Sequence, residues 1–234
     1  MALILNIETS TTICSVSLAR NGKKIIAKES NEKNAHSKIL TVFIEDIFKD
    51  ANLQVKDIDA VAVSKGPGSY TGLRIGVSVA KGIAYGIGKP LITVSTLLNM
   101  TYGAKQKIIA DVNDLFAPMI DARRMEVYTQ LFNNQLVCEN KINAKIIDEQ
   151  SFLLELEKQK VHFFGDGAMK CKQAIKHKNA FFYEDLHPSA DYMILFSEKA
   201  FNENKFEDIA YFEPFYLKDF VATIPKKNIF GERI

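Results

Sequence analysis

The segment of residues 64–86, SKGPGSYTGLRIGVSVAKGIAYG, restricts the fold most strongly, because four glycines lie inside a stretch with the pattern of a helix. Each glycine within a helix costs roughly 1 kcal/mol relative to alanine, and close approach by another helix or strand is the usual compensation. We therefore interpret these glycines mainly as packing positions. Gly66-Pro67-Gly68 forms the turn before the helix, and Ser69 or Thr71 is suited to cap it.

The glycine spacing does not fit the common phosphate loops. A P-loop requires GxxxxGK[ST], and a dinucleotide-binding loop requires GxGxxG at the start of its helix. Helical periodicity instead places one set of mostly small residues on a single face: Gly72, Gly76, Val79, Ala80, Ile83 and Gly86. The first turn of the helix remains a candidate anion site, because free N–H groups and the helix dipole attract negative charge there.

Apolar periodicity predicts two similar α/β lobes joined near residue 100. Residues 3–29 are typical of three strands, with Asn21-Gly22 as a hairpin turn. The stretch HSKILTVFIEDIFKD predicts an amphipathic helix over residues 36–50, with Ser37 as its N-cap. The other predicted elements are strands at 59–64, 91–94, 107–112, 116–121, 125–132, 135–143 and 161–164, and helices at 71–87, 95–104, 151–160, 168–178 and 189–203.

The predicted lobes span residues 1–100 and 101–220. Each contains several strands followed by helices, which is the pattern of an α/β fold. We expect the helix at 189–203 to pack back on the first lobe, and residues 221–234 to form a tail.

Composition argues against several classes of protein. The 234 residues carry a formal net charge of +2 and no basic block of the kind that binds nucleic acid. The three cysteines are widely spaced, which favours free thiols in a reducing compartment over disulfides or a zinc site. The start lacks a signal-peptide pattern, and no apolar run is long enough to cross a membrane, so we expect a cytoplasmic protein without membrane contact.

No recognised catalytic motif is present. The four histidines are scattered and form no HExxH pattern, and there is no GxSxG elbow, so a metal site is not expected. A lone histidine at a helix start, such as His36, is expected to be solvated or to cap the helix.

Three polar turns could contribute to a site. Glu8 ends a strand and is followed by Thr-Ser-Thr-Thr, which could hold phosphate oxygens while Glu8 orients Mg²⁺, although a polar hairpin turn is the commoner arrangement. Asp121, Arg123 and Glu126 lie between two strands, where a salt-bridged hairpin turn is expected. Gly165-Asp166-Gly167 resembles a nucleotide-edge turn, but a single GxG is a weak signal.

Several motifs together resemble one known family. LNIETSTTICSVSL, HSKIL, VSKGPGSYTGLRIGVSVAKGIA, IDARRMEVY, GDGA and PFYLK match the TsaB (YeaZ) family in order and spacing, from residue 3 to about 218. The resemblance implies the actin-like ATPase fold (ASKHA, ribonuclease H-like), with two lobes that each contain a mixed sheet flanked by helices.

The resemblance also implies a function. The family supports the enzyme that adds threonylcarbamoyl to the adenosine next to the tRNA anticodon, as a non-catalytic dimerisation or scaffold subunit. The implied partners are the catalytic paralogue TsaD in a heterodimer and the small ATPase TsaE, with a homodimer in isolation and tRNA contact only through the complex. TsaD carries a metal-binding histidine pair in the region of Thr96 to Thr101, where this chain has none. We therefore expect no intrinsic cofactor, and ATP or ADP only in the assembled complex.

The family dimerises through two helices of the first lobe, which correspond here to residues 36–50 and 71–87. The resemblance thus implies a set of partner-interface residues: Ile39, Leu40, Phe43, Ile44, Gly72, Gly76, Val79, Ala80 and Ile83. The hydroxyl-rich turn after Glu8 and the glycine turn before the helix at 71–87 give a second set, the candidate anion or nucleotide contacts: Glu8, Thr9, Ser10, Gly66 and Gly68.

Other functions remain open at the level of sequence. One alternative is an enzyme, either a metallopeptidase of the glycoprotease type or a small-molecule kinase of the actin fold. A kinase needs a catalytic aspartate and complete phosphate loops, and a metallopeptidase needs metal ligands. A third alternative is an RNA-binding module, which tRNA retention in modest salt would test.

Overall fold

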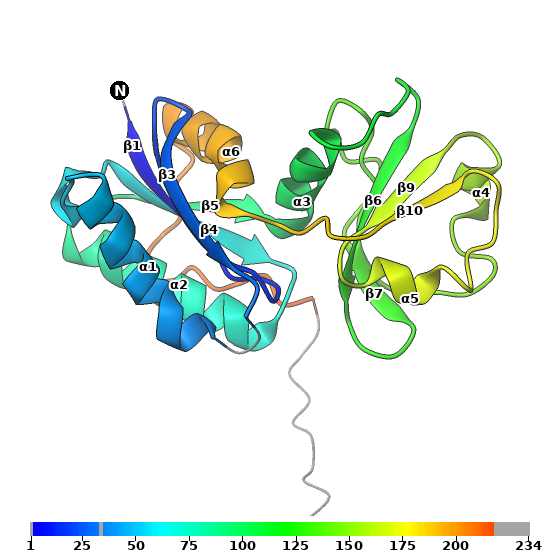
Figure 1. Cartoon of the computed structure of the whole chain (residues 1–234), viewed down its shortest axis with the longest axis horizontal. Coiled ribbons are helices and arrows are strands. Elements are labelled where there is room, and N and C mark those ends of the chain that lie inside the picture. The colour runs from blue at the N-terminus through cyan, green and yellow to red at the C-terminus, as the bar shows by residue number, and fades with distance from the viewer. Residues whose placement is uncertain (1, 33–34, 218–234) are drawn as a thin grey trace, which may run out of the picture.

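The computed structural model describes residues 2–32 and 35–217, so the predicted tail at 221–234 lies outside the described residues. The described chain forms two lobes side by side, each built on a five-stranded mixed sheet with helices beside it (Figure 1). The two-lobed α/β class predicted from the sequence is therefore confirmed.

The first sheet contains β1 (Leu3–Glu8), β2 (Cys14–Arg20), β3 (Lys23–Ser30), β4 (Ala60–Gly66) and β5 (Leu91–Ser95), in the order β3-β2-β1-β4-β5. β1, β2 and β3 pair antiparallel, whereas β1, β4 and β5 are parallel. The β2–β3 turn is Asn21-Gly22, both with positive φ, as its sequence predicted.

Helices cover both faces of this sheet. The helices α1 (His36–Asp50) and α2 (Tyr70–Gly86), with the short 3₁₀ turn Val55–Asp57 between them in sequence, lie on one face. The helix α6 (Ala190–Asn202) lies on the opposite face, and α3 (Thr96–Lys105) lies between the two lobes (Figure 1).

The second sheet contains β6 (Leu115–Asp121), β7 (Glu126–Thr129), β8 (Asn143–Ile146), β9 (Val161–Phe164) and β10 (Ala180–Tyr183), in the order β10-β9-β6-β7-β8. Two four-residue helices belong to this lobe, α4 (Leu153–Leu156) and α5 (Ala168–Cys171). Its core includes Phe163 and Leu156, both fully buried.

Alternation along the strands assigns each side chain to a face. Leu3, Leu5 and Ile7 of β1 are buried against α1 and α2, whereas Ile4 packs in a separate cluster with Met193 of α6. This period of two is what a strand buried on both faces requires.

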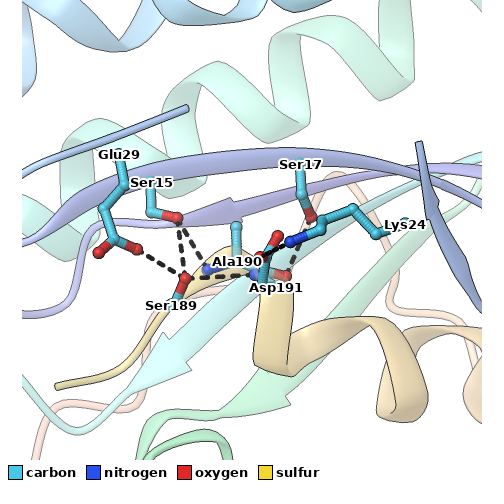
Figure 2. Close-up of polar contacts among 7 residues, drawn as sticks. All are labelled: Ser15, Ser17, Lys24, Glu29, Ser189, Ala190 and Asp191. Carbon is cyan, nitrogen blue, oxygen red and sulfur yellow. Dashed lines mark hydrogen bonds and ion pairs between the residues drawn. The ribbon is translucent and has the colours of Figure 1, made fainter. Parts of the chain in front are cut away.

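The helix α6 belongs in sequence to the far end of the second lobe but docks on the first sheet through polar contacts (Figure 2). The Ala190 N–H donates to Ser15 Oγ at 2.9 Å, and Ser17 Oγ donates to the Ala190 carbonyl at 3.0 Å. Lys24 also forms an ion pair of 2.6 Å with Asp191. Two buried serines of β2 thus hold the start of α6 in one position.

The segment after α6 runs back along the first lobe. The Glu207 N–H donates to the Leu91 carbonyl, and the Phe215 N–H donates to the Lys65 carbonyl at 2.7 Å. Lys81 of α2 donates to the Phe212 carbonyl at 3.0 Å. The bond to Leu91 covers the start of β5, the edge strand of the sheet, and the other two fasten the segment to β4 and α2.

Several predicted elements of the second lobe are wrong. Residues 107–112 form turns and coil rather than a strand, and β8 begins only at Asn143 instead of filling 135–143. The predicted helices at 151–160 and 168–178 shrink to single turns, and β10 was not predicted. Short apolar runs become strands only where a neighbour supplies hydrogen bonds, and local periodicity does not contain that information.

The predicted N-cap of α1 is also wrong. The helix begins at His36 after Ala35, no side chain caps it, and Ser37 lies exposed within the first turn. In α2 the cap is Ser69, one of the two predicted residues, because its hydroxyl accepts a hydrogen bond from the Gly72 N–H, whereas Thr71 lies inside the helix.

Candidate partner surface and interlobe cleft

The helices α1 and α2 together present an apolar surface on the outside of the first lobe. Apolar residues that are not fully buried recur three or four positions apart on each helix, so they lie along one side of it. We call this surface the helix-pair face, and it consists of Ile39, Val42, Phe43, Ile75, Val79 and Ile83. Val42 is 49% exposed, and the other five are partly exposed and pack on the core from outside.

Five of the predicted interface residues are buried inside this chain instead. Leu40 and Ile44 point into the core below α1, and Ala80 does the same below α2. Gly72 and Gly76 are buried as well. Most of a wide apolar arc on a helix packs into the core of the lobe that contains the helix. The members of the predicted set that remain at the surface are Ile39, Phe43, Val79 and Ile83.

The glycines of α2 divide into two groups. A Cβ at Gly72 would overlap the Thr9 carbonyl oxygen, and a Cβ at Gly76 would overlap Thr9 Oγ1. A Cβ added at Gly82 or Gly86 would meet no atom within 4 Å. The first two glycines therefore pack against the β1–β2 turn of the same chain, while the last two face open space.

The carboxylate of Glu8 is fully buried beside that turn and is committed to bonds within the chain. Its Oε1 accepts hydrogen bonds from the Ser10 N–H at 2.7 Å, from Ser10 Oγ at 2.5 Å and from Ser64 Oγ at 2.9 Å. Its Oε2 accepts one from Asn99 Nδ2 at 2.7 Å. Burial raises the pKa of Glu8, and these hydrogen bonds oppose that effect only in part.

The other candidate anion contacts also bond to or pack against groups of the same chain. Thr9 Oγ1 donates to the Gly72 carbonyl at 2.8 Å, and the Ser10 carbonyl accepts from the Ser69 N–H at 2.7 Å. A Cβ at Gly68 would overlap the Ser10 carbonyl oxygen, and a Cβ at Gly66 would lie 2.9 Å from the Phe215 carbonyl oxygen. The turn that could have held phosphate is thus packed against the chain itself.

A cleft of about 330 Å³ opens beside this turn, between the two lobes. One wall is formed by residues 10–12 and by the N-terminal turns of α1 and α2, and it is rich in hydroxyl groups. The opposite wall belongs to the second lobe and includes Ile120, Asp121 and Asp166.

The two aspartates of the second lobe differ in their partners. Asp121 lies at the predicted hairpin turn, where it accepts a hydrogen bond from the Arg123 N–H, and its ion pair is with Lys170 outside that turn. Asp166 Oδ1 accepts a hydrogen bond from the Asp121 N–H at 3.0 Å. Asp166 makes no ion pair with any residue that the structure describes.

Two cleft residues were missed at the level of sequence. His36 was expected to be solvated or to cap its helix, yet it is 7% exposed, it is the first residue of α1, and its Nε2 lies 3.1 Å from the Ile13 carbonyl oxygen. Asp166 carried only the weak signal of its flanking glycines. Within residues 2–32 and 35–217, no group of three or more His, Cys, Asp and Glu side chains could hold a metal ion. No helix among the same residues is long and apolar enough to cross a membrane.

Comparison with known sequences gives a consistent group of relatives. The sequence model of the family described as "TsaD: tRNA N6-adenosine threonylcarbamoyltransferase" matches residues 25–226. The Escherichia coli K12 protein named tRNA threonylcarbamoyladenosine biosynthesis protein TsaB is 32% identical over 228 residues, which cover 94% of this chain and 96% of that protein. The Haemophilus influenzae protein of the same name is 27% identical over 228 residues and covers 94% of each chain.

Solved structures share the fold. A Pseudomonas aeruginosa protein described as similar to peptidase YeaZ superposes with a TM-score of 0.82 at 23% identity, over 93% of this chain and all of that one. YeaZ from Pseudomonas aeruginosa gives a TM-score of 0.76 at 24% identity over the same shares. Together with the two mixed sheets, this likeness confirms the predicted actin-like fold class.

Proposed function

Because the chain belongs to the TsaB family of tRNA threonylcarbamoyladenosine biosynthesis proteins, we propose that it is a non-catalytic scaffold subunit for a TsaD-type catalytic paralogue. The observation that carries this proposal is the helix-pair face, an apolar surface over two neighbouring helices with no partner within the described chain. The names of the relatives favour tRNA modification over the metallopeptidase and kinase hypotheses.

The proposed absence of catalysis rests on the polar side chains of α3, which are buried within the chain. Asn99 donates to the buried Glu8, and Thr101 Oγ1 donates to the Leu97 carbonyl at 2.7 Å. Thr96, Asn99 and Thr101 are all fully buried. In the region where the resemblance implies metal-binding histidines in the catalytic paralogue, these side chains therefore support the fold between the lobes.

We further propose that the isolated chain holds no nucleotide. A phosphate in this turn would need the Ser10 N–H, which already donates a hydrogen bond to Glu8. The Gly72 N–H likewise donates to the Ser69 hydroxyl. ATP or ADP would then bind only in the assembled complex with the TsaD-type and TsaE-type subunits. Calorimetry with Mg-ATP on the isolated chain tests this, and saturable binding would contradict it.

The remaining partners follow from the same surface. In isolation the helix-pair face would bind a second copy of the chain, so we propose a homodimer that exchanges for the heterodimer. Contact with tRNA would occur through the complex, in the cytoplasm. Light scattering on a sizing column tests the homodimer, since Phe43→Asp is expected to convert it to a monomer.

The central experiment is copurification with the TsaD-type paralogue. Phe43→Asp and Val79→Asp place a charge in the helix-pair face without entering the core, because both side chains are only half buried. An apolar residue near the centre of an interface contributes about 2 kcal/mol or more, so we expect roughly thirtyfold weaker binding. The matched control is Leu195→Asp on α6, a residue that is 48% exposed on the opposite side of the sheet.

Two results would contradict the proposal. If the face variants bind as well as the control does, the surface is placed wrongly. If the wild-type chain fails to bind the paralogue, and cells that lack it keep normal levels of the modified adenosine, the scaffold function itself is wrong.

A further inference from the structure

Asn6 lies in β1, the central strand of the first sheet, and it is fully buried. The period of two along the strand places its side chain on the same face as those of Ile4 and Glu8. Ile4 packs with Met193 of α6, and Glu8 bonds to α3. The amide of Asn6 therefore lies on the face of the sheet that is opposite to α1 and α2.

Both ends of this amide lack a hydrogen-bond partner within residues 2–32 and 35–217. Neither Asn6 Oδ1 nor Asn6 Nδ2 is accessible to solvent, and neither bonds to a group of these residues. The strands β2 and β4 flank Asn6 and α6 contacts β1, and all three elements lie within the described ranges. An enclosed amide without any partner would carry a large desolvation penalty, which native proteins avoid at more than about nine in ten buried polar groups.

The side chains beside the amide are small. In register with Asn6 are Ser17 of β2 and Ala62 of β4, and their side chains lie on the same face. Ser17 Oγ donates its single hydrogen to the Ala190 carbonyl at 3.0 Å, as Figure 2 shows, and its oxygen can still accept. The amide is thus bordered by two short side chains and by an acceptor at the start of α6.

The opposite character of the two amide ends determines which ligand fits. Oδ1 only accepts and Nδ2 only donates, so a cation would leave Nδ2 unpaired and an anion would leave Oδ1 unpaired. Either ion would also bring a charge into the interior, which is costly. A water molecule donates and accepts without a charge, and buried waters usually make about three hydrogen bonds. Exchange of the oxygen and nitrogen positions does not alter this conclusion, because both ends are unpaired.

We propose that the space between Asn6 and the start of α6 is a binding site for an ordered internal water. Oδ1 and one hydrogen of Nδ2 point the same way along the edge of the planar amide, so a single water bonds to both and donates its second hydrogen to Ser17 Oγ. The docking of α6 then combines this water bridge with the direct bonds of Ser15 and Ser17 to Ala190. The site lies across the sheet from the helix-pair face, so it is independent of the proposed scaffold function.

The first test is a high-resolution crystal structure of the full chain, with separate soaks in rubidium and bromide salts. We expect a density peak about 2.7–3.2 Å from both amide atoms of Asn6, without anomalous signal from either ion. Asn179 is the internal control, because its Nδ2 donates to the Leu156 carbonyl at 2.8 Å. An anomalous peak beside Asn6 would overturn the proposal, as would a direct bond from its amide to the protein or an amide with no density beside it.

The second test counts long-lived internal waters in solution by oxygen-17 relaxation dispersion. Asn6→Leu has a similar volume without polar atoms, and we expect it to lower the count by about one relative to wild type. Ala62→Val retains the amide but fills the space beside it, so the same decrease is expected. Ser197→Ala is the matched control on α6, because this buried hydroxyl already donates to the Ile194 carbonyl at 3.2 Å.

The two proposals fail in distinguishable ways. An unchanged water count in Asn6→Leu would contradict the internal water site, whatever the binding of the paralogue. Asn6→Leu and Ala62→Val should still copurify with the paralogue, whereas Phe43→Asp should lose the paralogue and keep the wild-type water count.

Discussion

On one face of the first sheet, which we call the apolar face, mainly apolar side chains pack against α1 and α2. On the other face, which we call the polar face, an apolar cluster that includes Ile4 and Met193 is accompanied by polar side chains that bond to α3 and α6. Leu5 and Ile7 belong to the apolar face, and Glu8, Ser15 and Ser17 belong to the polar one. Apolar packing is non-directional, but each hydrogen bond fixes a partner and an angle.

This difference explains what each face can do. The polar face holds the two helices that connect the lobes, so it determines how the lobes meet. The apolar face only requires that α1 and α2 cover it, which leaves their outer residues available for a partner. Substitutions on each face test this division of roles.

The largest effect is expected for Glu8→Ala on the polar face. The substitution leaves the Ser10, Ser64 and Asn99 donors buried without an acceptor, and it creates a cavity. We expect a loss of about 3 kcal/mol or more in the free energy of unfolding. Urea denaturation measures it, and a loss below that of a typical surface substitution would show that the polar cluster does not hold the lobes.

A pair of glycine substitutions tests the α2 side of the sheet. Gly72→Ala forces a methyl group into the Thr9 carbonyl oxygen, and we expect a loss of roughly 1–3 kcal/mol. Gly82→Ala adds a methyl group in open space within the same helix and should stabilise the chain by up to about 1 kcal/mol. Opposite signs in thermal or urea unfolding support the assignment, and equal signs would reject it.

The pH dependence of stability isolates the charge of Glu8. Because its folded pKa is raised, its contribution is fully present below the unfolded value near 4.5 and is lost as the pH rises through the folded pKa. Glu8→Gln removes this titration and keeps one hydrogen-bond acceptor. The new amide N–H can donate to Asn99 Oδ1, which lacks a partner within residues 2–32 and 35–217, once the Asn99 side-chain amide has rotated to exchange its oxygen and nitrogen. The stability of Glu8→Gln relative to wild type should therefore increase with pH, and a constant difference would contradict the shift.

The smallest effect is expected at the surface of the polar face. Lys24→Gln removes the ion pair with Asp191, in which the lysine side chain is 53% exposed. Such pairs contribute about 0.2–1 kcal/mol and are screened by salt. The difference in unfolding free energy should shrink between low and high salt, whereas Ser17→Ala, which removes a buried bond, should be insensitive to salt.

Local sequence determined much of the first lobe. The Asn21-Gly22 turn, the Ser69 cap and the helices near 36–50 and 71–87 follow from short-range patterns, because the residues that fix them are close in the chain. In the second lobe, α4 and α5 are single turns, and β10 exists through its pairing with β9. Such elements depend on distant partners, which local periodicity does not report.

The candidate sites divide in the same way. Four glycines in one helix already implied close packing, but the sequence treats Gly72 and Gly82 alike. The tertiary structure places the β1–β2 turn against Gly72 and Gly76 and leaves Gly82 and Gly86 open. It also buries Glu8 among donors of its own chain while Asp166 lines the cleft without an ion pair within the described residues. The physical reason is that burial, desolvation and pairing depend on residues tens of positions away, whereas turns and caps depend on neighbours.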